Sequence, residues 1–471
     1  MIIKYFIIGI VIICSILLSK NKILTSILAG LFISLQIAFT IFAISLRGQT
    51  DSIYFTYDEL GLIFLGILGI LSVTSYYTSL IYLKFEPIEN YNIYFIGFLG
   101  LILSITGVYL ANNITLTWIF MEATTLSVAA LIYHNRTIFS LEATWKYVFI
   151  CSTGIAIAYL GILFLSMASQ GIASNGMSYQ NIALAAKAGD PLYLKVSFIF
   201  ILVGYSAKME IFPLYTIGID ANYVAPAPAS AFISTALVNA GFLSIFRFYK
   251  TLVGTMVGHW LGHVLIITGL FSLLVAAIYM QRVKNYKRLL AYSTVEVMGI
   301  AIIGLGLGGN GCYAAILLVI LHSFVKSSMF YQFGQVHKIL KTYKIFKTGG
   351  YLQLYPAGAM VLIIGLIVLM GIPPSGLFIP ELMIFRTAFA SGQWPIFLIV
   401  SILICFIIYG MSSKILQLIF SPIEREIDTQ TKINPLQTLP QYIMLGFAMY
   451  MCFSQPEFLK DLILKASTIL P

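Results

Sequence analysis

Charged residues are scarce in this chain of 471 amino acids, where Asp, Glu, Lys and Arg together make up only 9%. A soluble globular protein carries about 25% charged residues. Hydrophobic residues account for 60% of the chain, and its mean hydropathy is +0.96. These values exclude a soluble globular domain and predict a protein that is surrounded by lipid. The net charge of +10 therefore fits loops at a membrane surface and not a nucleic-acid partner.

Cysteine is also sparse, with five residues that lie far apart and show no paired spacing. This pattern argues against a disulfide framework, a zinc site and an iron–sulfur cluster, and we expect the five to be small core residues. No P-loop, haem motif or nucleophile elbow is present. Residues 304–309 match the dinucleotide-binding pattern, but they end an apolar run and no strand precedes them. We therefore predict no cofactor, no metal and no catalytic centre within this chain.

Long apolar runs are abundant, and about fourteen of them have the roughly 18–25 residues that cross a bilayer as a helix. The predicted fold is thus an all-α polytopic membrane protein. Pro213 interrupts the seventh run and Pro374 the twelfth, so these two spans should be broken helices. The first run lacks a cleavage site and is interpreted as a retained helix, and residues 458–469 as an amphipathic segment at the interface. The predicted spans are 2–18, 24–46, 60–83, 91–110, 114–133, 144–167, 193–217, 227–250, 258–280, 289–307, 311–334, 354–390, 396–419 and 440–454.

Basic residues are distributed unevenly over the predicted loops. Sixteen Lys and Arg residues lie in loops after odd-numbered spans, and eight lie on the other side. Cytoplasmic loops of membrane proteins are enriched in these residues. The bias predicts an inner (plasma) membrane protein whose basic loops 282–288 and 338–347 are cytoplasmic and whose two termini are external.

Ionisable residues recur at a nearly constant offset. Glu122 and Glu296 are 174 positions apart (296 − 122), and Lys208 and Glu381 are 173 apart (381 − 208). The offset suggests that spans 4–8 and 9–13 are copies, and because each copy has five helices, the second must be inverted, as in many transporters. The predicted organisation is a three-helix N-terminal segment (1–90), a first five-helix unit (91–250), a second, inverted unit (251–420), and a last helix with the amphipathic segment (421–471).

Ionisable side chains inside spans are the strongest functional signal, because each costs about 2.5–3.5 kcal/mol at the bilayer centre. The chain must pair them, hydrate them or use them. Lys208 lies five residues before Pro213, which opens the helix and frees a carbonyl that can hold water. Lys208 could instead pair structurally with Glu210, and Glu122 with Lys208, although a pair that can open would also serve proton transfer. Glu381 follows the second proline break.

Three further positions are candidates. His322 and Lys326 are four residues apart and share a helix face, which suits a water-linked relay, although a lone histidine is more often a core residue. Glu296 could relay protons or simply be satisfied by the hydroxyls next to it on its own helix. Lys146 and Glu142 are also four apart, near a span boundary, where a surface ion pair is equally consistent.

Several segments between roughly residues 90 and 390 carry a family resemblance. They are Glu122-Ala-Thr-Thr-Leu, Leu141-Glu-Ala-Thr-Trp-Lys-Tyr, Cys151-Ser-Thr-Gly-Ile-Ala, Gly204-Tyr-Ser-Ala-Lys, Asp220-Ala with Ala225-Pro-Ala-Pro, Lys287-Arg-Leu-Leu-Ala-Tyr-Ser and Gly371-Ile-Pro-Pro-Ser-Gly-Leu-Phe. Jointly the chain resembles the antiporter-like membrane subunits shared by respiratory complex I, Mrp cation/proton antiporters and group 4 membrane-bound hydrogenases. The amino-acid sequence of the fifth and sixth spans is most similar to that of the hydrogenase-4 component F branch.

This resemblance implies fourteen helices with two inverted half-channels joined by a central hydrophilic axis. It assigns relay roles to Glu122, Lys146, Lys208, His322, Lys326 and Glu381.

The chain also departs from its relatives. Tyr215 and Asn222 stand where they often have histidine, Asn239 where complex I relatives have lysine, and Val297 where histidine is common. Transport between Lys208 and the second unit is then either impaired or carried by water and Glu210.

Three functions follow from these observations. The preferred one is a proton-translocating subunit of a multisubunit oxidoreductase, either hydrogenase-4-like or complex I-like. Its expected partners are other membrane subunits and a peripheral iron–sulfur or hydrogenase-like arm. The second is a sodium/proton antiporter subunit without redox chemistry, and the third is a structural membrane-arm subunit whose relay has decayed.

Overall fold

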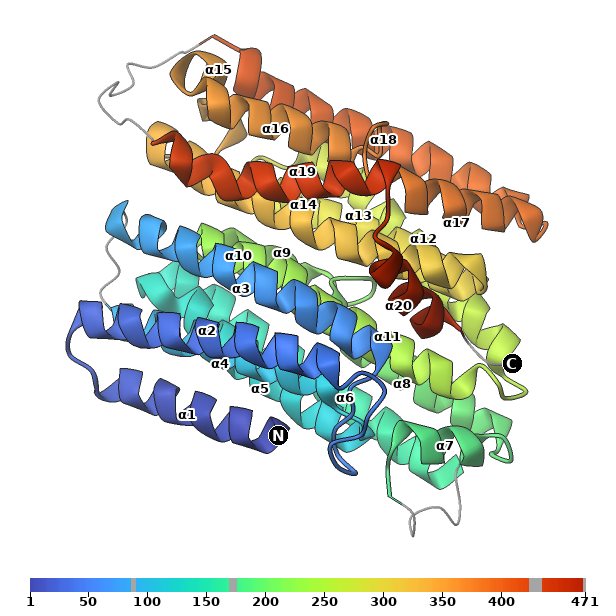
Figure 1. Cartoon of the computed structure of the whole chain (residues 1–471). Helices are drawn as coiled ribbons and strands as arrows, with labels where there is room; N and C mark the ends of the chain where they lie inside the picture. Colours follow the sequence, from blue (N-terminus) through green and yellow to red (C-terminus); the bar gives the residue numbers. More distant parts are fainter. Residues whose placement is uncertain (86–89, 169–175, 423–433, 469–471) are drawn as a thin grey trace.

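The computed structural model describes residues 1–85, 90–168, 176–422 and 434–468, and within these ranges the only β-structure is a few isolated bridges. Eleven helices in the described ranges are long and apolar enough to cross a membrane. The chain is therefore an all-α polytopic membrane protein, as predicted (Figure 1). The predicted total of fourteen would need three further crossings by the shorter helices α1, α16–α17 and α19.

The elements follow one another without long insertions. In chain order they are α1 (Ile2–Leu18), α2 (Lys22–Ser45), α3 (Glu59–Phe85), α4 (Tyr91–Leu110), α5 (Ile114–Ile132), η1 (Tyr133–Asn135), α6 (Ile138–Ala168), α7 (Tyr179–Ala186), α8 (Pro191–Met209), α9 (Thr216–Val224), α10 (Ala227–Phe232), the π-turn η2 (Ile233–Leu237), α11 (Val238–Leu252), α12 (Gly258–Arg282), α13 (Tyr286–Leu307), α14 (Asn310–Leu340), η3 (Ile345–Lys347), α15 (Tyr351–Leu354), α16 (Pro356–Leu369), α17 (Phe378–Ala390), α18 (Trp394–Phe420), η4 (Pro435–Thr438), α19 (Leu439–Phe453) and α20 (Glu457–Ser467).

The bundle has two distinct ends (Figure 1). At one end the N-terminal ammonium pairs with Asp51 at 3.0 Å, and Arg47 pairs with Asp461 of α20 at 2.9 Å. We call this the terminal end, because it gathers both chain termini. Loops 282–288 and 338–347 lie at the opposite end, which we call the basic end.

Two five-helix sets run through this bundle in opposite directions. α4 ends beside the 50–58 segment at the terminal end, whereas α12 ends at Arg282 at the basic end. In both sets the first helix packs against the second and the second against the third. The sets are α4, α5, α6, α8–α9 and α10–α11, and then α12, α13, α14, α16–α17 and α18.

The fourth crossing of each set is broken in the same way. Glu210 after α8 and Gly371 after α16 both have a left-handed backbone, with φ of 59° and 60°, and cis peptide bonds precede Pro213 and Pro374. Both features recur with an offset of 161 residues (371 − 210 and 374 − 213). The two broken spans are thus confirmed.

Lys208 and Glu381 are not equivalent relative to these breaks. Lys208 lies in the last turn of α8, before its break, and Glu381 lies in the first turn of α17, after its break. The 173-residue offset predicted from these two residues therefore does not describe a shared position. At the break the backbone repeats at 161, and the charge moves from one side of the break to the other.

Buried helices run through the middle of the bundle. α10–α11 and α14 are buried along their membrane-crossing length, whereas α18 and α2 expose most of theirs to the surroundings. Asn239 of α11, and His322 and Lys326 of α14, lie on these buried helices. Polar groups there are kept from lipid by the outer helices, as the cost of unpaired polar groups in a bilayer requires.

Three basic residues counted above as loop charges are built into helix ends instead. Arg247 donates to the last carbonyls of α4, Lys287 to those of α9, and Lys414 to those of α12. Cations at helix C-termini satisfy orphan carbonyls and oppose the helix dipole. Without them the bias becomes 14 to 7 (16 − 2 and 8 − 1), so the two-to-one ratio is unchanged.

One expectation from the sequence needs correction, and others concern residues outside the described ranges. Cys151 and Cys312 are buried, but Cys14 and Cys405 are exposed on outer helices, so the five cysteines are not all core residues. Sulfhydryls are apolar enough to face lipid. The counted residues Arg425 and Lys432, and position 469 of the amphipathic segment, lie outside the described residues.

Candidate functional site

Lys208 is held by hydroxyl groups and not by a carboxylate. Its ammonium, buried at the end of α8, donates to Thr125 at 2.8 Å, to Thr124 at 3.1 Å and to the Tyr147 hydroxyl at 3.4 Å. Within the described ranges, no ion pair joins Lys208 to Glu122 or Glu210. The structure therefore does not contain the direct pairs considered from the sequence.

Thr125 connects Lys208 to Glu122. Its hydroxyl accepts from the Lys208 ammonium and donates to one Glu122 carboxylate oxygen at 3.4 Å. The other carboxylate oxygen accepts from Ser152 of α6 at 2.6 Å. α5 thus places Thr125 and Glu122 one turn apart on the face that meets α6 and α8. The result is a hydrogen-bonded chain that runs from an ammonium through one hydroxyl to a carboxylate.

Glu210, which the sequence offered only as a partner of Lys208 or as a substitute in transport, occupies the break itself. One of its carboxylate oxygens accepts from Asn222 of α9 at 2.9 Å, and the other is buried without a hydrogen-bond partner. A Cβ on Gly218 would lie only 2.4 Å from this carboxyl group, so α9 packs directly on it. In the sequence, the position of Glu210 between Lys208 and Pro213 already indicated that it lies in the broken span.

The second group lies between α13 and α14. The Lys326 ammonium donates to the Leu290 carbonyl at 2.5 Å and to the Ser293 hydroxyl. Glu296, one turn along α13, is buried and has one carboxylate oxygen without a partner. Neither ring nitrogen of the buried His322 has a partner. Ser293 thus serves Lys326 and not Glu296, contrary to the simple structural alternative.

Asn239 lies between the two groups. It exchanges hydrogen bonds with Ser323 of α14 at 2.8 and 3.2 Å, directly after the π-turn η2. Two residues later, Gly241 packs on the backbone of Lys208 and Met209, where a Cβ would lie 2.6 Å from the Met209 nitrogen. This contact brings α11 against the end of α8, so Asn239 adjoins both the Lys208 region and α14.

Glu381 is only partly buried. It lies in the first turn of α17, and its carboxylate lies against Gly371, where a Cβ would come within 2.4 Å of an oxygen. A cavity of about 530 Å³ at the terminal end is lined in part by the same helix, through Met383, Arg386, Thr387 and Ala390. Glu381 is therefore the candidate nearest to an opening at that end.

Lys146 is separated from the buried groups. It is exposed and pairs with Glu142 at 2.5 Å, the i,i+4 surface pair that the spacing allowed. Both residues line a cavity of about 770 Å³ at the basic end. The structure therefore brings Glu122 and Lys208 together, brings Lys326, Glu296 and His322 together, and leaves Lys146 and Glu381 nearer the two ends.

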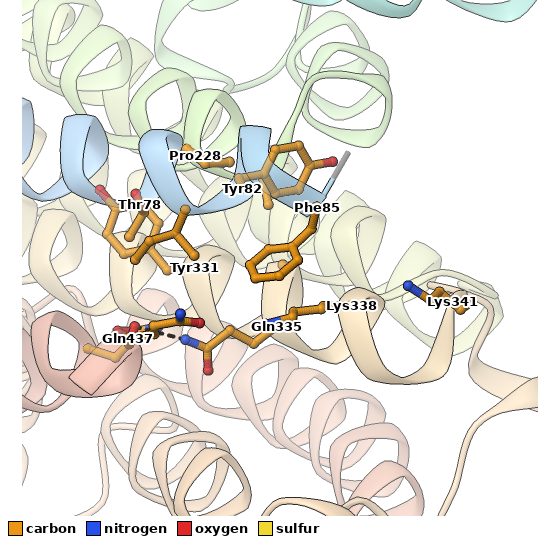
Figure 2. A pocket seen from close by; sticks show the side chains of 13 residues that line it. Thr78, Tyr82, Phe85, Pro228, Tyr331, Gln335, Lys338, Lys341 and Gln437 are labelled. Atoms are coloured by element: carbon orange, nitrogen blue, oxygen red, sulfur yellow. Dashed lines mark hydrogen bonds between the residues drawn. The ribbon is translucent and has the colours of Figure 1, made fainter. Parts of the chain in front are cut away.

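A small cavity with a mixed apolar and polar lining lies beside α14 (Figure 2). Thr78 and Tyr331 lie on one side of it and Lys341 on the other, and the Tyr331 hydroxyl bonds to Ser75 of α3 at 2.6 Å. Its volume of about 50 Å³ can hold roughly three water molecules, at about 10–15 Å³ each. The cavity therefore has room for water beside Tyr331 of α14.

The chemistry available in these groups is proton transfer. Carboxylates, lysines, a histidine and hydroxyls are present, and several buried polar atoms have no protein partner, a situation that water normally satisfies. Among the described residues, no group of three or more His, Cys, Asp or Glu side chains is arranged to hold a metal ion.

Known proteins resemble this chain both in sequence and in fold. A family model described as NADH:quinone oxidoreductase/Mrp antiporter, TM matches residues 111–445. A hydrogenase-4 component F homolog from Methylacidiphilum infernorum (isolate V4) is 32% identical over 350 residues, which cover 72% of this chain and 73% of that protein.

A more distant relative is the Na(+)/H(+) antiporter subunit A1 of Staphylococcus aureus (strain JH9), which is 27% identical over 381 residues. The match covers 77% of this chain but 46% of the relative, so the chain spans just under half its length. A chain in the structure of the membrane-bound sulfane sulfur reductase, an archaeal respiratory membrane complex, has a TM-score of 0.85 at 22% identity, over 99% of this chain and 96% of that one. This likeness shows the fold.

Proposed function

Because the chain belongs to the NADH:quinone oxidoreductase/Mrp antiporter family of membrane subunits, we propose that it translocates protons as one subunit of a multisubunit membrane complex. The observation that carries this proposal is the chain from Lys208 through Thr125 to Glu122. A buried ion pair would satisfy both charges and serve structure alone. A hydroxyl between them keeps the charges apart and gives the proton a path.

In the first unit, 91–250, the Thr125 hydroxyl passes the proton between the two charges. It can accept a proton from the Lys208 ammonium while donating its own to Glu122. Transfer leaves a neutral amine and a neutral carboxylic acid, which removes two charges from a region where each is costly. Ser152 and Tyr147 hold the carboxylate and the amine in place during this step.

In the second unit, 251–420, Lys326, Glu296 and His322 form the corresponding group, and Glu381 leads to the terminal end. Glu210 and Asn239, with water, join the two units. We propose that the basic end faces the cytoplasm of the inner membrane and the terminal end faces outside, on the two-to-one charge bias. Partner membrane subunits and a peripheral iron–sulfur or hydrogenase-like arm would supply the energy.

Proton uptake by vesicles that contain the purified complex tests this function. Glu381→Gln and Lys326→Met should each abolish uptake at matched assembly, because Lys326 is the cation of the second group, Glu381 leads from it to the terminal end, and Val297 and Asn239 cannot carry a proton at physiological pH. Glu457→Gln on the exposed α20 is the matched control and should pump normally. Normal proton uptake with both Glu381→Gln and Lys326→Met would mean that the chain is a structural membrane-arm subunit that carries no protons.

Sodium/proton exchange is the alternative function, and the similarity to the Na(+)/H(+) antiporter subunit supports it. Uptake of radioactive sodium into the same vesicles under an imposed pH gradient separates the two. If the vesicles take up sodium and Lys208→Met abolishes this uptake, the function is sodium/proton antiport and not redox-linked proton transport.

A further inference from the structure

The cavity of about 770 Å³ at the basic end is large enough for a ligand, since small-molecule pockets typically measure about 300–1,000 Å³. It lies where α6 and α9 meet the start of α13, away from the buried groups described above. Five basic side chains line it, namely Lys146, Arg282, Lys284, Arg288 and Lys344, together with two acidic ones, Glu142 and Asp220.

Both acidic residues are already neutralised. Glu142 pairs with Lys146 at 2.5 Å, and Asp220 pairs with Arg288 at 2.9 Å. The Arg288 guanidinium also stacks on the Tyr223 ring, with its carbon 4.5 Å from the ring centroid. These contacts leave three cations of the cavity, Arg282, Lys284 and Lys344, without an acidic partner among the described residues.

Two of these cations are held next to each other by the backbone. Lys344 and Asn285 form an antiparallel bridge, and the Lys284 carbonyl accepts from the Ile345 amide at 3.1 Å. Lys284 and Lys344 are therefore pinned on paired segments that both face the cavity. Like charges held on paired segments repel each other, and an anion between them removes that cost.

The wall beside the cavity is apolar and faces outward. Trp145 and Phe149 on α6 are 65% and 72% exposed, and Tyr279 on α12 is 47% exposed. Aromatic side chains at this level mark the lipid–water interface. A ligand in the cavity would thus have cations around its head and a lipid-facing helix surface beside it, an arrangement that suits an amphiphile and not a free ion.

We propose that this cavity binds the phosphate headgroup of an anionic phospholipid, whose acyl chains lie along α6. Basic pockets between helix ends at the cytoplasmic face are known to take such headgroups. The lipid would seal the gap between the two units at the basic end and fix loops 282–288 and 338–347. This site does not depend on proton transport, so it can be tested apart from the proposed function.

Lipid retention by the purified complex is the direct test. The double substitution Arg282→Gln with Lys344→Gln removes two unpaired cations and should weaken binding of the lipid roughly thirtyfold, at about fivefold per cation. Mass spectrometry of the native complex in mild detergent should show the anionic lipid on the wild type and its loss from the variant. The matched control, Lys20→Gln with Lys22→Gln, removes two exposed cations from the turn between α1 and α2 and should retain the lipid.

Two further measurements keep the proposal open to refutation if the double variant does not assemble. A photoactivatable phosphatidylglycerol should label peptides that contain residues 139–149, 282–288 or 344–346 of the wild type, and labelling elsewhere would overturn the site. Phosphatidylglycerol, but not phosphatidylcholine, should raise the unfolding temperature. Equal protection by inorganic phosphate would show that the cavity takes a free phosphate and would refute the lipid.

Discussion

Removing one hydroxyl between Lys208 and Glu122 should slow transport sharply while leaving the protein assembled. Thr125→Val keeps the shape of the side chain but breaks the bonds at 2.8 Å to Lys208 and 3.4 Å to Glu122. A hydrogen bond to a charged group contributes about 1.5–3 kcal/mol. If the transfer barrier rises by that amount, the rate should fall about 10- to 150-fold, because each 1.36 kcal/mol is tenfold.

Thr124, the residue next to Thr125, provides a closely matched control variant. Thr124→Val also removes one partner of Lys208, at 3.1 Å, but Thr124 makes no contact with Glu122 and donates to the Met121 carbonyl instead. Initial rates of proton uptake by vesicles would be compared at equal amounts of complex, with Thr125→Ser expected to restore the wild-type rate. If Thr125→Val and Thr124→Val are equally mild, the hydroxyl only solvates the lysine and the connection to Glu122 carries no protons.

Other consequences can be measured separately. Arg247→Met should greatly lower the yield and unfolding temperature of the complex, because removing one partner of a buried charge cluster costs about 3–5 kcal/mol, whereas Lys22→Met, at an exposed position, should not. The hydrogen bond from Arg47 holds the pKa of Asp461 below its usual range, so this pair stabilises the protein at neutral pH and stops doing so as the pH falls below about 4. Asp461→Asn should therefore lower the unfolding temperature at pH 7 but have little effect below pH 4, and an equal effect at both would contradict the assignment. A cysteine at position 344 should react with an impermeant reagent only after the cells are opened, and reaction from outside would reverse the orientation.

The fold was largely predictable because hydrophobicity dominates it. Apolar runs located the crossings, and prolines at 213 and 374 located both breaks. The extent of α9 was not predictable, since Thr216–Val224 continues the seventh crossing through polar residues. Asn222 and Asp220 lie on this helix, where Asn222 binds Glu210, while the sequence alone suggested a loop.

The presence of ionisable residues inside the helices was predictable from the sequence, but their hydrogen bonds were not. Charged side chains in apolar runs stand out because their burial is expensive. Threonine does not stand out in the same way, since it occurs throughout these helices as a neutral residue, so the bridging role of Thr125 could not be predicted from the sequence. The same holds for basic residues such as Arg247 and Lys287, whose role as helix caps cannot be separated from that of loop charges by counting.

The two breaks turn four half-helix ends toward the membrane interior, and this has an electrostatic consequence. A helix carries partial negative charge at its C-terminus and partial positive charge at its N-terminus, worth about 0.3–1 kcal/mol to a nearby opposite charge and up to about 2 in partly buried positions. Lys208 stands at the C-terminus of α8, and Glu381 stands at the N-terminus of α17. Each residue has the sign that its own half-helix favours. The lysine in one unit and the glutamate in the other therefore have the same explanation. An ionisable residue before the break is favoured as a cation, and one after the break is favoured as an anion.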